Sequence, residues 1–112
     1  MFLKGVRTYI LDGERVVSCP SVMEWARWNE GAANTRVDYT EITSDCRVST
    51  VFLGLDHRFF GDGPPLVFET MIFGGPKDLD ENLWRYSSWD DAAIGHKAAV
   101  RKAREAIGQK VR

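Results

Sequence analysis

The chain has few of the residues on which redox or metal chemistry usually depends. Its 112 residues contain two cysteines and two histidines. Cys19 and Cys46 form no CxxC motif, and the chain contains no HxH, HExxH or DxDxDG motif. A disulfide-stapled scaffold and the common metal motifs are therefore excluded. We expect two reduced thiols, no metal site and no cofactor.

Long apolar runs and a charge of one sign are also missing. No stretch approaches the roughly 18 apolar residues of a membrane-spanning helix. The first residues carry Lys4, Gly5 and Arg7 without the apolar run of a secretory leader. A formal net charge of -1 gives no general attraction to nucleic acid or to an anionic membrane. We expect a cytosolic protein, with neither a membrane nor a nucleic acid as its partner.

What is present is an ordinary globular composition. Hydrophobic residues make up 44% of the chain and charged residues 28%, with four tryptophans and six phenylalanines among them. A chain of this length can bury one core without disulfides or metals. The sequence therefore predicts a single domain over residues 1–112 whose core or interface is rich in aromatic rings.

Turn and capping signals divide the first half of the chain. Asp12-Gly13 tolerates the backbone of a two-residue turn and predicts a hairpin between strands at 6–11 and 14–18. Ser21 and Glu24 form a capping box that begins a helix, which we expect to end at about Asn29 or Glu30, before Gly31.

The second half contains three further strands and a long helix. Apolar runs predict strands at 37–42, 47–55 and 66–73. Ser88 caps a helix that extends to about Ile107 and ends at Gly108. The order is β-β-α-β-β-β-α, and short connections between strands favour antiparallel pairing. We predict an α+β fold in which an antiparallel sheet of about five strands carries both helices on one face.

Four ionisable side chains suggest a site. Asp56 and His57 come at the exit of an apolar strand, and Glu69 is the one charged residue on an otherwise apolar strand face. His96 is the one polar member of an apolar, alanine-rich stripe on the last helix, a position where histidine is more often a core residue. If these groups converged, imidazole beside carboxylate could act as a base, a proton shuttle or a metal ligand. A small metal-assisted hydrolase is therefore the alternative to a binding protein.

A second group of residues suggests ligand binding. Arg85, Tyr86 and Trp89 cluster rings around a guanidinium before the last helix, and Phe59 and Phe60 add two more rings. Such a group can stack on a base or grip a partner protein, although packing in the core is the commoner role.

The last helix carries cations on its predicted outer side. Arg101 and Arg104 belong to a basic stripe that continues into the tail at 110–112. A solvated face is the usual role of such a stripe, and phosphate binding is the alternative. A small anionic ligand, such as a nucleotide, fits this limited patch better than DNA does.

Several segments resemble a known family of small uncharacterised proteins from tailed bacteriophages and prophages. The matching segments are VSTVFLGLDH at 48–57, PLVFETM at 65–71, RYSSW at 85–89 and GH at 95–96. Ser88 stands where the family would have threonine, and both residues cap helices. The resemblance brings no established activity and implies a setting, the cytoplasm of a bacterial host.

These observations lead to one preferred function and two alternatives. We expect a non-enzymatic phage accessory protein, a homo-oligomer through its alanine-rich helix or its exposed rings. It would inhibit a host protein in antiviral defence or sequester a nucleotide-like ligand. The alternatives are the hydrolase described above and a structural or morphogenetic phage component.

Overall fold

The structure is a computed structural model that describes residues 7–32 and 35–109. The start of the first predicted strand at Val6 and the basic tail at 110–112 lie outside the described residues. The elements, in chain order, are β1 (Tyr9–Asp12), β2 (Arg15–Ser18), α1 (Val22–Gly31), β3 (Arg36–Thr43), β4 (Cys46–Phe52), β5 (Phe68–Gly74), β6 (Leu83–Tyr86) and α2 (Trp89–Ile107).

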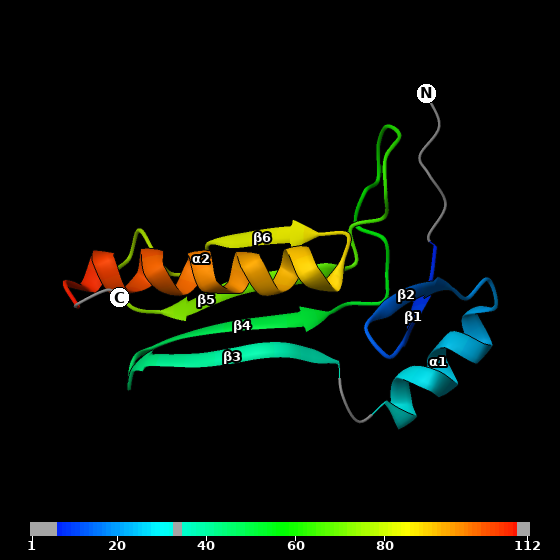
Figure 1. Ribbon diagram of the computed structural model, residues 1–112, viewed down its shortest axis with the longest axis horizontal. Coiled ribbons are helices and arrows are strands. Elements are labelled where there is room, and N and C mark those ends of the chain that lie inside the picture. Colours follow the sequence, from blue (N-terminus) through cyan, green and yellow to red (C-terminus); the bar gives the residue numbers. More distant parts are fainter. Residues whose placement is uncertain (1–6, 33–34, 110–112) are drawn as a thin grey trace.

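The structure confirms an α+β fold built from antiparallel strands, and it refines the arrangement of those strands. They form two sheets, a hairpin of β1 and β2 and a larger sheet in the order β3-β4-β5-β6 (Figure 1). Strand β6, which follows a turn at residues 75–81, is additional to the five predicted strands. Because β3 to β6 pair in chain order, the larger sheet is a simple meander.

Local signals in the sequence set the helix boundaries. The hydroxyl of Ser21 accepts a hydrogen bond from the Glu24 N–H at 3.2 Å, and that of Ser88 accepts one from the Asp91 N–H at 3.1 Å. Gly108 ends α2 in the left-handed conformation, with φ 84°. The two predicted N-caps and the predicted end of α2 are therefore confirmed.

The hairpin turn differs from the prediction by one residue. Asp12 pairs with Arg15, so the two turn residues are Gly13 and Glu14 rather than Asp12 and Gly13. Gly13 has φ 64° at the first position of the turn, where glycine is favoured because it has no Cβ.

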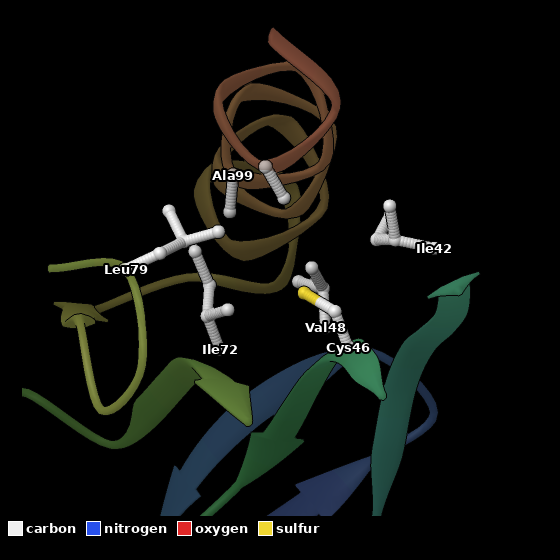
Figure 2. Packing of buried hydrophobic residues seen from close by; sticks show 7 residues of the cluster. Ile42, Cys46, Val48, Ile72, Leu79 and Ala99 are labelled. Carbon is white, nitrogen blue, oxygen red and sulfur yellow. The ribbon is translucent and has the colours of Figure 1, made fainter. Parts of the chain in front are cut away.

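Helix α2 packs across one face of the larger sheet, called here the covered face. The buried core between them comprises Ile42, Cys46, Val48, Ile72, Leu79, Ala99 and Ala103 (Figure 2). Alanines on the helix allow its backbone to approach the strands closely. The alanine stripe that we expected to mediate oligomerisation is therefore buried within the molecule.

The hairpin and α1 lie at one end of the larger sheet (Figure 1). A second buried cluster connects them to the sheet and to α2, and comprises Leu11, Phe52, Val67, Phe68 and Ala92. Trp28 of α1 meets the Phe52 ring edge to face, with centroids 5.9 Å apart. The prediction placed both helices over one sheet, whereas α1 packs with the hairpin.

Both cysteines, Cys19 and Cys46, are buried and free. Burial raises the pKa of the Cys46 thiol, and the nearby Asp80 carboxylate adds to that rise. Of the helices in the described part of the chain, neither is long and apolar enough to cross a membrane.

Candidate functional site

His96 lies between α2 and the covered face of the sheet and is only 1% exposed. Its Nδ1 is 2.7 Å from the Thr50 hydroxyl on β4, and its Nε2 is 2.9 Å from the Thr40 hydroxyl on β3. Thr50 is also hydrogen-bonded to Thr70 on β5. Three strands thus supply one hydroxyl each to a buried chain that satisfies both nitrogens of the ring.

The surroundings of His96 favour the neutral imidazole. Burial lowers its pKa, and the Asp38 carboxylate, whose nearer oxygen is 3.8 Å from Nε2, opposes that shift. Asp38 is half exposed, so its charge is partly screened by water. A neutral imidazole has one nitrogen that donates and one that accepts, and each of them finds a hydroxyl group here. This arrangement is typical of a histidine with a structural role.

Glu69 does not share a pocket with His96. Side chains alternate along a strand, so Glu69 points to the opposite face of the sheet from its neighbour Thr70. Its carboxylate pairs with the Arg85 guanidinium, with Nε and Oε2 3.0 Å apart, across a register pair of β5 and β6. Glu69, whose side chain is 16% exposed, is therefore half of a cross-strand ion pair.

Asp56 and His57 organise the chain after β4. Asp56 is 4% exposed, and its Oδ1 accepts hydrogen bonds from the N–H groups of Arg58 at 2.8 Å and Leu66 at 2.9 Å. His57 Nδ1 donates to the carbonyl of Leu55 at 2.9 Å. The four residues of the proposed hydrolase site therefore serve separate local structures. Within residues 7–32 and 35–109, no three histidine, cysteine, aspartate or glutamate side chains are placed to hold a metal.

The predicted ligand-binding residues also separate. Tyr86 and Trp89 pack against the second core cluster, where the Trp89 ring meets Phe68 edge to face at 6.2 Å. Arg85 lies on the opposite face of the sheet, because residues alternate along β6. The aromatic–arginine cluster of the sequence is thus divided between two faces.

The arginines of α2 form no joint site with Arg85. Arg101 is exposed on the helix, and Arg104 Nη1 donates to the Gln109 side-chain oxygen at 2.7 Å. Gln109 in turn donates to the carbonyl of Ile42 at 3.1 Å, which ties the end of α2 to β3. Arg104 therefore helps to anchor the end of the helix. The described cations of the basic stripe do not point toward a common position where a phosphate could bind.

Two phenylalanines remain conspicuously exposed. Phe59 and Phe60 are 47% and 61% exposed and lie in the loop 57–66, called here the Phe loop. The sequence grouped them with the rings at 84–89, but those rings pack into the protein while the loop rings face solvent. The Phe loop is therefore the candidate binding site.

The Phe loop is held in shape by its own hydrogen bonds. Besides the two that Asp56 accepts, the His57 N–H donates to the Leu66 carbonyl at 2.9 Å. The Arg58 guanidinium donates through Nε to the Pro64 carbonyl at 2.9 Å. This guanidinium lies 3.0 Å from the position that a Cβ would take at Gly63, where φ is 144°. A side chain at Gly63 would thus disturb the bridge across the loop.

Sequence reasoning missed the three threonines that surround His96. Thr50 stands between the inward residues Val48 and Phe52, and Thr70 stands between Phe68 and Ile72. A polar residue at an inward position of two successive strands was the signal that a buried hydrogen-bond partner exists.

Comparison with protein-family models, with curated proteins and with solved structures finds no match for this chain.

Proposed function

We propose that this chain is a non-enzymatic accessory binding protein of the phage type, which inhibits a host protein by gripping it with the Phe loop. The observation that carries the proposal is the exposure of Phe59 and Phe60 on a loop whose base is fixed by Asp56. The resemblance to phage proteins supports a bacterial cytoplasmic setting, in which inhibiting a host protein of antiviral defence is the role that we propose.

Physical chemistry favours a contact role for these two rings. Burying a phenylalanine side chain stabilises a complex by about 1.5–3 kcal/mol, and aromatic residues often dominate interface energetics. The hydrogen bonds at the base of the loop restrict its conformations before binding, so less entropy is lost when a partner is bound. An exposed pair of rings on a pre-shaped loop is therefore well suited to fill a pocket on another protein.

A protein partner fits the geometry better than a sequestered nucleotide does. Arg85 is paired with Glu69 on one side of the sheet, while Arg101 and Arg104 lie on α2. Binding a phosphate usually requires several cations or N–H groups that converge on one point. The cations expected to bind an anion are thus spread over separate surfaces.

The test is site-specific photo-crosslinking in the bacterial host. Benzoylphenylalanine is placed at position 60, and the same group at Ile94, an exposed position on α2 (67% exposed), serves as the control. We expect one host protein to be crosslinked from position 60 and not from position 94. Crosslinking to a virion protein instead, or equal products from both positions, would contradict the proposal.

The identified host protein is then purified and its affinity measured by calorimetry. Phe60→Ala is expected to weaken binding about 10- to 100-fold, as is usual for a central aromatic contact. Ile94→Ala removes a comparably exposed apolar side chain and should leave the affinity unchanged. A Phe60→Ala variant with wild-type affinity would show that the loop is not the contact.

A further inference from the structure

One face of the larger sheet has no described helix or strand packed on it. Helix α2 lies on the covered face, and the hairpin and α1 lie at the end of the sheet (Figure 1). The strand registers arrange the side chains of the opposite face, called here the open face, in three rows that run across the strands. The middle row consists of Tyr39, Ser49, Met71 and Leu83.

The middle row has large, mainly apolar side chains at its two ends and a small side chain, Ser49, near its centre. Tyr39 and Leu83 are each 41% exposed although they lie within strands, and Met71 is half-buried. Ser49 next to Met71 leaves room for another surface to approach closely. This row has the character of the centre of an interface, because rings and methionine are enriched there and charges are depleted.

The two flanking rows carry the charges of the open face. On one side of the middle row lie Glu41, Arg47 and Phe73, and on the other lie Arg36, Val51, Glu69 and Arg85. Within the molecule, Arg36 stacks on Tyr39 at 4.7 Å and Arg47 on Phe73 at 5.1 Å. The two guanidinium groups thus lie over rings of their own copy.

We propose that the open face binds a second copy of this chain, face to face, about a two-fold axis that runs along the middle row. Such a rotation leaves every strand opposite its counterpart and exchanges the two flanking rows. Glu41 of one copy then faces Arg36 of the other, whereas Arg47 faces Val51 and Phe73 faces Glu69. The contact between Glu41 and Arg36 occurs twice, once on each side of the axis, while Glu69 keeps its partner Arg85 within its own copy.

The other symmetric arrangement is disfavoured by the same charges. A two-fold axis parallel to the strands would place β3 of one copy over β6 of the other, because the order is β3-β4-β5-β6. Arg36 would then face Arg85 in the same row, and two like charges would be brought together. Charge complementarity therefore favours the axis along the middle row. Two sheets can stack in this arrangement at the usual distance of about 10 Å.

The size of the open face predicts a weak dimer. Four strands about 4.8 Å apart and three rows about 6.8 Å apart give a flat area of about 400 Å² per copy. The total of about 800 Å² lies below the roughly 1,200 Å² at which stable specific interfaces begin, so we expect a weak dimer that dissociates at micromolar concentrations. Stacking would roughly double the shortest dimension of the molecule, which is 21 Å beside 46 and 36 Å.

The test combines two charge reversals. Glu41→Arg alone and Arg36→Glu alone should each abolish dimers in sedimentation equilibrium, because each puts like charges at both symmetric contacts. An equimolar mixture of the two variants should form a heterodimer with near wild-type affinity, since both contacts regain opposite charges. Circular dichroism checks that each variant is folded.

Two further measurements complete the test. Met71→Asp should abolish the wild-type dimer, whereas Ile94→Asp on the exposed side of α2 should leave it intact. Small-angle scattering should show a particle that is thickened rather than lengthened. The proposal is overturned by a wild-type protein that stays monomeric at high micromolar concentration, by a dimer that survives Met71→Asp, or by a mixture that remains monomeric.

Discussion

The two faces of the four-stranded sheet accommodate polar side chains in different ways. On the covered face, His96 and three threonines form an uncharged chain of hydrogen bonds beneath α2. On the open face, Arg85 forms an ion pair with Glu69, and two further arginines, Arg36 and Arg47, stack on rings. Burying a charge costs far more than burying a hydrogen-bonded neutral group, so the helix covers the face whose polar groups can be neutral.

The strongest challenge to this comparison is to remove the buried ring. His96→Ala leaves a cavity and deprives the hydroxyls of Thr40 and Thr50 of a partner, so we expect a loss of about 3–5 kcal/mol in the free energy of unfolding. Urea denaturation measures the loss. Ile94→Ala, two residues earlier but exposed, is the matched control and should change stability by less than about 0.5 kcal/mol. A similar loss of unfolding free energy for both variants would mean that the His96 ring contributes no more to stability than an exposed side chain does.

Acidification tests whether the covered face requires a neutral imidazole. Because burial lowers the pKa of His96 in the folded state, the unfolded chain binds a proton first as the pH falls. The free energy of unfolding should therefore be independent of this group above about pH 6.5 and fall below it, by up to about 1.4 kcal/mol per pH unit.

The corresponding control is His96→Leu, which cannot titrate. The difference in unfolding free energy between wild type and variant, measured from pH 8 to about pH 5, isolates the contribution of this ring. A difference that stays constant over this range would show that His96 takes up its proton equally well in both states.

The smallest effect is expected on the open face. Replacing Glu69 and Arg85 singly and together by alanine should give a coupling energy of about 1 kcal/mol or less, which weakens with added salt. The double-mutant cycle is measured by urea denaturation of the monomer at low protein concentration. A coupling energy several times larger and insensitive to salt would mean that this ion pair is shielded from water, and that the open face is therefore not exposed.

Local features of the fold were predictable from the sequence, and the pairing of distant segments was less so. The caps at Ser21 and Ser88 depend on contacts within one turn, and they were predicted correctly. Strand β6 is only four residues long and carries rings that also suit a loop, so its sequence alone did not distinguish it. Its pairing with β5 is what makes it a strand.

The candidate site shows the same limit. The alternation along residues 66–73 separated Glu69 from Thr70 correctly, but both sides of this strand are rich in apolar residues. Nothing in that pattern specifies which side α2 covers, so the convergence of Glu69 with His96 could not be judged from the sequence. Similarly, Asp56 was noticed for its charge, whereas its position near backbone N–H groups follows only from the folded loop.

The closed base of the Phe loop has a consequence for how such a protein can change. Backbone hydrogen bonds connect Leu53 with Val67 and His57 with Leu66. The two ends of the loop are therefore held together independently of the side chains at its tip. Substitutions at positions 59 and 60 would change the exposed tip of the loop and leave the hydrogen bonds at its base in place. The binding specificity proposed for the Phe loop could therefore change through its tip residues while the rest of the fold stays the same.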